Sequence, residues 1–199
     1  MNKEIDITGI TIKTRRLTLR PFCQDDLDDF YEYAKVDGVG QMCGWLPHKS
    51  LEESKDILDI FIAGKNQFAL VYNNKVVGSI GIEKYNEKEL DEFSSLKGRE
   101  VGYVLSKDYW GQGLMSEAIQ GVIKYLFEEV KLDFIAGSFF KRNNRSRRVQ
   151  EKNGFKFYKD IIYETRYGTK EDSVYMILTK EESIYMILAK DEYINKNNN

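Results

Sequence analysis

The feature of this sequence that most constrains its fold is a strand, a glycine turn and a long amphipathic helix in close succession. Residues 100–105 (EVGYVL) are typical of a strand, residues 111–113 (GQG) form a turn, and residues 114–130 place apolar side chains at helical spacing. Glycine reaches positive φ and lets a backbone approach a ligand closely. No Ser, Thr, Asp or Asn stands directly before Leu114 as a conventional N-cap. A phosphate group is therefore the natural candidate acceptor for the first N–H groups of this helix.

Several kinds of turn place glycines before a helix. A Walker loop is excluded because no Gly-x-x-x-x-Gly-Lys-Ser/Thr occurs in the chain. A Rossmann fingerprint would need a third glycine where Ser116 stands and an opening βαβ unit, whereas this turn follows a predicted hairpin past the middle of the chain. On this segment alone, a tight turn that serves only close packing stays open as the alternative.

The other segments predict one mixed α/β domain rather than a regular βαβ repeat. Helices are expected after Asp25 and after Ser50, where Ser-x-x-Glu has the form of a capping box. Two β-rich runs around Asn73 and Asn74 predict a hairpin. Strands are expected at 15–22, 68–72, 76–82, 100–105, 134–140, 155–163 and 174–178, and a short helix at 146–153.

Composition and charge limit the class of protein. The chain has 199 residues, of which 42% are hydrophobic and 31% charged, and no apolar run approaches the length of about 18 that a membrane span needs. The acidic N-terminus shows no secretory signal, so a cytoplasmic protein is expected. Two cysteines and one histidine predict neither a disulfide framework nor a metal site. The net charge of −2 argues against nucleic acid, but five positive charges between 141 and 148 suggest a small anionic ligand.

A near-duplication marks the C-terminal end. Residues 173–182 (SVYMILTKEE) are followed at once by 183–192 (SIYMILAKDE) and then by an Asn-rich tail that is expected to be disordered. We interpret residues 1–182 as the domain and 183–199 as an added copy of a strand-like segment. The alternative is that the spare strand pairs with a sheet edge of a second subunit in a homodimer.

Two spaced motifs and the opening residues resemble the GNAT superfamily of acetyltransferases, in the Rim-type branch that includes ribosomal-protein N-terminal acetyltransferases. The motifs are Tyr-Trp-Gly-x-Gly-x-x-x-Glu-Ala at 109–118, Asn-x-x-Ser at 143–146 and Glu-Lys-x-Gly-Phe at 151–155, and the opening is Thr-x-Arg-Leu-x-Leu-Arg-Pro at 14–21. The resemblance covers Arg15 to about Leu178 and is specific, because the motifs occur at the expected separation. It implies a central, mixed, mostly antiparallel and twisted sheet flanked by helices.

The resemblance also implies an acetyl-CoA-dependent N-acetyltransferase that uses no metal. The strand at 103–105 would run alongside the pantetheine arm, and the backbone amides of 111–116 would hold the diphosphate. The residues expected to contact the coenzyme are Tyr103, Val104, Leu105, Gly111, Gln112, Gly113, Leu114, Met115, Ser116, Asn143 and Arg147.

The implied catalytic residues are Glu100 and Ser146. Glu100 stands where family members often carry a general base, although a surface charge at a strand end is the alternative. Ser146 would donate a hydrogen bond or proton to the departing thiolate. Two departures matter: Asp108 replaces a Gln or Arg common in the wider superfamily, and Gln150 stands where many relatives carry a tyrosine acid and where this branch carries an aliphatic residue.

The acceptor stays open among a protein N-terminus, a polyamine, an aminoglycoside and an amino-acid-like metabolite. Aromatic residues such as Trp45, Phe61, Tyr85 and Phe93 are candidates for its surroundings or for the core. Two other functions stay open. One is a non-catalytic acetyl-CoA sensor with the same fold. The other is a nucleic-acid binder that uses residues 141–148, against which the acidic pI of about 5.7 argues.

Overall fold

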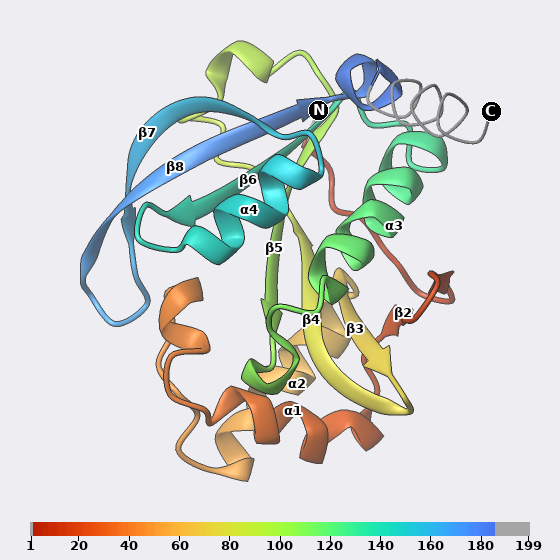
Figure 1. Ribbon diagram of the computed structural model, residues 1–199, viewed down its shortest axis with the longest axis vertical. Coiled ribbons are helices and arrows are strands. Elements are labelled where there is room, and N and C mark those ends of the chain that lie inside the picture. Colours follow the sequence, from red (N-terminus) through yellow and green to blue (C-terminus); the bar gives the residue numbers. More distant parts are fainter. Residues whose placement is uncertain (1, 186–199) are drawn as a thin grey trace, which may run out of the picture.

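One eight-stranded sheet carries helices on both faces in the computed structural model of the protein, which describes residues 2–185 (Figure 1). Its strand order is β1-β2-β3-β4-β5-β6-β8-β7, and neighbours are antiparallel except for β5 and β6. The elements are β1 (Ile12–Lys13), β2 (Thr18–Pro21), η1 (Gln24–Asp26), α1 (Leu27–Ala34), η2 (Gly40–Cys43), α2 (Leu51–Gly64), β3 (Gln67–Tyr72), β4 (Lys75–Glu83), η3 (Asp91–Phe93), β5 (Gly98–Leu105), η4 (Lys107–Tyr109), α3 (Leu114–Glu128), β6 (Phe134–Phe140), α4 (Asn144–Lys152), β7 (Lys156–Glu164) and β8 (Lys170–Thr179). The predicted fold class is confirmed.

Alternation along β3 explains why both faces of the sheet are covered. Successive strand side chains point to opposite faces, and β3 is apolar on both. Phe68 and Leu70 pack into the core beneath α3, together with Ile80 of β4. Ala69, which lies between them, packs with α1 and with Leu58 of α2. The sheet is therefore the middle layer, with α3 and α4 on one face and α1 and α2 on the other.

Two local signals operate as the sequence predicts. Asn73 and Asn74 have φ of 50° and 61°, the left-handed pair that a two-residue hairpin turn requires between β3 and β4. Ser50 caps α2, because its Oγ accepts from the backbone N–H of Glu53 at 3.1 Å. Both boundaries therefore follow from signals within a few residues, a pair of dihedral angles in the turn and a hydrogen bond at the cap.

The N-terminal segment departs from the predicted strand at 15–22. Only Thr18–Pro21 form β2, and the short strand β1 was not anticipated. The cause is Glu117 in the first turn of α3, which accepts from Thr14 Oγ1, Arg16 N and Arg16 Nε at 2.6–2.7 Å. These bonds hold the backbone of Arg16 toward α3 and away from the sheet.

The second copy of the duplicated segment begins in a helix, not in a strand. Residues 180–185 are helical. Thr179 and Glu182 form a capping box, since the Glu182 carboxylate accepts from Thr179 N at 3.1 Å and the Thr179 hydroxyl accepts from Glu182 N at 3.3 Å. The rest of the segment that we interpret as an addition, 186–199, lies outside the described residues.

Candidate functional site

β5 and β6 lie side by side for only three residue pairs and then diverge (Figure 1). The last pair is Glu100 with Ala136; beyond it, β5 pairs with β4 as far as Leu105 and β6 pairs with β8 as far as Phe140. The inner edges of the two strands therefore face each other across a V-shaped gap, and no strand among the described residues fills it. An extended ligand with amide groups can pair with such an edge as an added strand does.

The short ladder between β5 and β6 begins at a glycine. A Cβ at Gly98 would lie 2.1 Å from the ring of Phe134, the residue paired with it on β6. A side chain at position 98 would therefore displace the Phe134 ring from its place beside β5. Gly98 therefore allows the close pairing of β5 with β6 at the end of the ladder away from the gap.

The glycine turn leads directly into α3. Gly111 and Gly113 have φ of 78° and 76°, and Gly113 is the N-cap of α3 without a side-chain cap. The indole Nε1 of Trp110 donates to the carbonyl oxygen of Leu105 at 2.8 Å, which fixes the turn against the end of β5. The first turn of α3 therefore offers backbone N–H groups and the positive end of the helix dipole to an anion.

A cavity of about 780 Å³ joins the turn to the gap. The predicted site residues that line it are Glu100, Tyr103, Val104, Leu105, Gly111, Gly113, Leu114, Met115, Ser116, Asn143 and Ser146. Gln112 and Arg147 are not among its lining residues. The Gln112 amide donates to the carbonyl oxygen of Asp108 at 3.2 Å, and Arg147 pairs with Glu151 at 2.8 Å. Eleven predicted residues thus meet at one cavity and two lie outside its lining.

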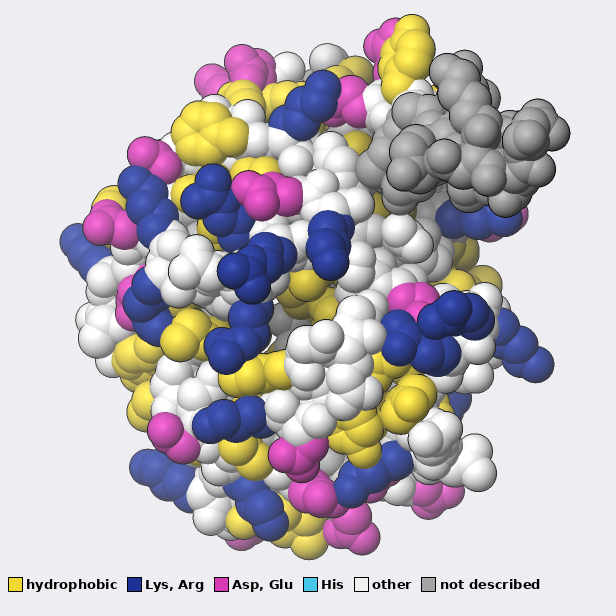
Figure 2. All heavy atoms as spheres, in the orientation of Figure 1, with side chains coloured by type: hydrophobic (Ala, Val, Ile, Leu, Met, Phe, Trp, Pro, Cys, Tyr) yellow, Lys and Arg dark blue, Asp and Glu magenta, His cyan; other side chains and the backbone are white. Residues whose placement is uncertain are grey.

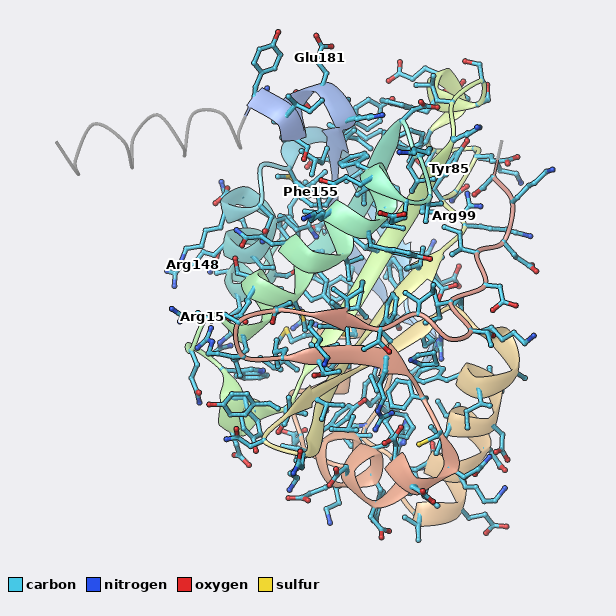
Figure 3. All side chains as sticks on the ribbon, turned by 90° about the vertical axis from the view of Figure 1, so that its right-hand side faces the viewer. Arg15, Tyr85, Arg99, Arg148, Phe155 and Glu181 are labelled. Atoms are coloured by element: carbon cyan, nitrogen blue, oxygen red, sulfur yellow. The ribbon has the colours of Figure 1, made fainter. Side chains whose placement is uncertain are left out.

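The cationic residues of α4 that do face the cavity are Arg145, Arg148 and Lys152. They recur at i, i+3 and i+7, which is one face of a helix, and Arg147 lies off that face. The guanidinium of Arg145 sits 4.3 Å from the centre of the Trp110 ring. Figure 2 shows Lys and Arg side chains gathered over α4 beside a hollow, and in Figure 3 Arg15 and Arg148 point to the same edge of the molecule. The sequence carried a signal for this face, because Arg145 and Arg148 are three residues apart and therefore lie on the same side of a helix.

Glu100 lies at the apex of the gap with two hydroxyl donors. Ser138 Oγ donates to Oε1 and Tyr175 OH to Oε2, each at 2.7 Å. Ser138 and Tyr175 are register partners on β6 and β8. Burial, assisted by the Glu83 carboxylate on β4, raises the pKa of Glu100 above its ordinary value, although the two hydroxyl bonds counteract part of the shift. Each carboxylate oxygen keeps a further lone pair, so the group can still accept a proton.

Ser146 is held at the start of α4 by two neighbours. The side chain of Asn143 caps the helix and accepts from Ser146 N at 3.1 Å. The phenol of Tyr103 lies 2.8 Å from Ser146 Oγ and also donates to the Ser146 carbonyl oxygen at 3.2 Å. A Ser hydroxyl and a Tyr phenol thus share one hydrogen bond on the wall of the cavity.

Two buried amides join α4 to the rest of the site. Gln150 is 1% exposed, and its Nε2 donates to the carbonyl oxygen of Ser138 at 3.4 Å. Asn153 is fully buried, and its Nδ2 donates to Ser116 Oγ at 3.1 Å. The polar residue at position 150 therefore packs against β6 in place of an aliphatic one, and α4 is fixed to the start of α3.

The α1–α2 side of the cavity is aromatic and acidic. It is lined by Trp45, His48, Glu53, Phe61, Glu83, Tyr163 and Tyr167, together with Arg166. The His48 ring shares a 2.7 Å hydrogen bond with Ser54, and burial lowers its pKa. Tyr85 and Phe93 belong instead to a separate core cluster under the loop before β5. Three carboxylates, counting Glu100, against the one guanidinium of Arg166 make this side suited to a cation.

The site contains residues that the sequence analysis missed. Ser138 is the only polar residue in the strand FIAGSFF, which is a signal that could have drawn attention to it. Tyr175 has no such signal, because β8 alternates through several apolar residues and only its pairing with β6 brings the phenol to Glu100.

Within residues 2–185, no group of three or more His, Cys, Asp or Glu residues could hold a metal ion. No helix in the described part of the chain is both long enough and apolar enough to cross a membrane.

Comparison with known proteins places these features in a family. The model of the acetyltransferase (GNAT) domain matches residues 16–156. The N-acetyltransferase p20 of Bacillus licheniformis is 28% identical over 177 residues, which cover 83% of this chain and 93% of the relative. A GNAT-family acetyltransferase from Bacillus anthracis has a crystal structure that matches with a TM-score of 0.75 and 26% identity, over 86% of this chain and 99% of that one.

Two further solved structures share the fold at 17% identity. RimJ of Mycobacterium smegmatis, in complex with CoA-disulfide, matches with a TM-score of 0.72 over 91% of this chain and 95% of that chain. A spermidine N-acetyltransferase from Vibrio cholerae, in complex with CoA and spermine, matches with a TM-score of 0.69 over 85% of this chain and 98% of that chain.

Proposed function

The chain belongs to the acetyltransferase (GNAT) family, and on that premise we propose that it moves the acetyl group of acetyl-CoA to a primary amine by direct attack within a ternary complex. Family membership makes the chain an N-acetyltransferase, as its motifs predict. The observation that carries the proposal is the open gap between β5 and β6, which shares one cavity with the uncapped start of α3.

The chemistry of acetyl-CoA fits this cavity. Its pantetheine arm carries amides that match the free edge of β5, and its phosphates match the turn at Gly111 to Gly113. Arg145, Arg148 and Lys152 supply positive charge along the same wall. The cavity volume of about 780 Å³ is within the range of ligand sites. Bound there, the cosubstrate supplies the activated acetyl group.

Glu100 acts as the general base in this proposal. An amine must be neutral to attack a thioester, and primary amines with an ordinary pKa of about 10.4 are mostly protonated near neutral pH. Glu100 lines the cavity, and its raised pKa improves its match to proton transfer near neutral pH. Ser138 and Tyr175 hold the carboxylate in one orientation while it accepts the proton, directly or through a water molecule.

Two further groups act on the thioester. A backbone N–H on the open edge of β5 polarises the carbonyl, as an oxyanion hole does. Ser146 donates a hydrogen bond to the sulfur as it departs. Asn143 supports this role, because it caps α4 and fixes the backbone of Ser146.

The acceptor is an amine on a protein N-terminus or on a small molecule. Neighbours of this fold include RimJ and a spermidine N-acetyltransferase, which makes both classes reasonable to test. The carboxylates of Glu53, Glu83 and Glu100 on the α1–α2 side favour a cationic acceptor over an acidic one.

Release of coenzyme A thiol from acetyl-CoA tests the proposal, with pools of peptides, polyamines, aminoglycosides and amino acids as acceptors. We expect release with at least one pool and intersecting initial-velocity lines, which a ternary complex produces. Parallel lines would refute direct attack and indicate a covalent acetyl-enzyme. Glu100→Gln should lose the rate but keep coenzyme binding, and Glu128→Gln on the exposed end of α3 should keep both. Silence with every pool, although acetyl-CoA binds, would favour the non-catalytic sensor.

A further inference from the structure

The pair formed by Tyr103 and Ser146 has a feature that the proposed function leaves unexplained. Ser146 Oγ has one proton to donate, and it can go either to the Tyr103 phenol or into the cavity. The phenol has two acceptors within reach, Ser146 Oγ at 2.8 Å and the Ser146 carbonyl oxygen at 3.2 Å. The two hydroxyls therefore have two arrangements, and only one of them leaves the serine proton free for a ligand.

The neighbours of Tyr103 keep its phenol available as a donor. Burial raises the pKa of Tyr103 to about 12, against the lowering effect of its hydrogen bonds with Ser146 and Gln150. The titratable neighbour on η2 is Cys43, whose thiol donates to the Tyr103 carbonyl oxygen at 3.4 Å and whose own pKa is raised by burial to about 12. Both groups therefore stay protonated throughout the neutral range. Gln150 contributes an amide, which does not ionise.

We propose that Tyr103 is a positioning residue: its phenol donates to Ser146 Oγ and so directs the serine proton to the sulfur that leaves the acetyl group. This inference rests on the proposed function. The amine nitrogen forms its bond to the carbonyl carbon, the carbon–sulfur bond breaks, and the electron pair stays on sulfur. Ser146 O–H stabilises that charge by a hydrogen bond, and Tyr103 O–H polarises the serine hydroxyl in the same direction. Neither residue changes its protonation state, and the thiolate takes its final proton from solvent.

Tyrosine at position 103 is placed for this role by the strand pattern. Glu100 points to the α1–α2 face of β5, whereas Tyr103 points to the α3–α4 face, where Ser146 lies in the first turn of α4. The gap between β5 and β6 separates the two faces, so a thioester lying in it has the base on one side and the hydroxyl pair on the other. Proton removal and leaving-group stabilisation thus occur on opposite faces of the sheet.

The test uses coenzyme A itself, so it does not depend on knowing the acceptor. A hydroxyl that donates to the sulfur lowers the pKa of the bound thiol, and the ultraviolet absorbance of the thiolate reports that pKa as the pH is raised. The complex with desulfo-coenzyme A gives the baseline. In wild type we expect the thiol pKa to fall by about one unit below that of free coenzyme A, the equivalent of a tenfold change. In Tyr103→Phe and in Ser146→Ala we expect most of that shift to disappear, while affinity for desulfo-coenzyme A stays unchanged.

The controls separate this role from a structural one. Tyr125→Phe removes a phenol from a partly buried tyrosine on α3 that packs against the same core and does not line the cavity, and it should keep the wild-type thiol pKa. Once an acceptor is known, Tyr103→Phe should lower kcat about tenfold to a hundredfold at constant KM for acetyl-CoA, but much less in the Ser146→Ala background. Equal losses in both backgrounds, or a thiol pKa that is the same in wild type and Tyr103→Phe, would overturn the inference. Failure of coenzyme A to bind wild type would overturn the proposed function instead, and this inference with it.

Discussion

Glu117 offers the sharpest test of how the cavity is held together. Its carboxylate, in the first turn of α3, accepts from Thr14 Oγ1 and Arg16 N on one oxygen and from Arg16 Nε on the other, at 2.6–2.7 Å. Replacement by Gln keeps the shape and the first oxygen but turns the second into an NH₂ group that faces the Arg16 guanidinium. One charge-assisted bond is lost and two donors are brought together. Because both side chains are less than a third exposed, the full value of such a bond applies, about 2 kcal/mol.

For a chain of this size, about 2 kcal/mol corresponds to a fall in Tm of roughly 4–8 °C. Thermal and urea unfolding at neutral pH measure it. Glu128→Gln is the control: it lies on the same helix, is 54% exposed and pairs with Lys124 at 3.9 Å, so it should change the free energy of unfolding by no more than about 0.5 kcal/mol.

The effect of Glu117→Gln on the free energy of unfolding should also depend on pH. Burial raises the pKa of Glu117, but the bonds from Thr14 and Arg16 outweigh it and hold the pKa below the ordinary 4.5. The stabilisation is therefore complete above pH 4.5 and is lost as pH falls through the lowered pKa of the folded state. Wild type and Glu117→Gln should accordingly converge in acid. An effect as small as that of Glu128→Gln, or a difference that does not narrow in acid, would refute this reasoning.

Three other predictions concern the site. Arg148→Ala should raise the KM for acetyl-CoA about tenfold in steady-state kinetics, whereas Arg147→Ala should change it by no more than about twofold. Equal effects would contradict the assignment of Arg148, and not Arg147, to the face of α4 that lines the cavity. Glu100→Gln should lower kcat about a hundredfold and remove the acid limb of the pH profile of kcat/KM, because wild-type activity rises as pH increases through the raised pKa of Glu100. If the variant keeps the acid limb, the general base is a different residue. Asn153→Ala should cost about 1–3 kcal/mol in urea unfolding, since it removes a buried bond to Ser116, and a loss under about 0.5 kcal/mol would show that water replaces the amide.

Features governed by neighbours in sequence were predictable. The turn at Asn73 and Asn74 needs two left-handed residues, and asparagine tolerates that conformation. Ser50 and the glycines before α3 likewise act through bonds or dihedral angles within a few residues. Thr179 and Glu182 also form a local signal, a capping box that starts a helix. The repeat of a strand-like segment led us to expect a second strand there instead.

Features that depend on strand pairing were not predictable from one sequence. Ser138 and Tyr175 reach Glu100 because β6 pairs with β5 on one side and with β8 on the other, and no local pattern encodes that order. The turn of Arg16 toward Glu117 joins positions 101 residues apart. Gln112 and Arg147 lie outside the cavity lining because their side chains point away from it, Gln112 toward Asp108 and Arg147 toward Glu151. The spacing of a motif does not specify the direction in which each of its side chains points.

If the proposed cosubstrate pairs with the free edges of β5 and β6, the narrow seam between these strands would also couple the lifetime of the protein to its supply of cosubstrate. Backbone hydrogen bonds join the two halves of the sheet over only three residue pairs, so a molecule that pairs with the free edges adds contacts between the two halves. At a concentration 100 times its Kd, such a ligand adds about 2.7 kcal/mol to the free energy of unfolding, which lowers the population of opened chains about a hundredfold. Proteases that cleave opened chains then remove the protein fastest when the ligand is scarce. The acetyl donor would in this way set how much of the enzyme persists, as well as how fast it works.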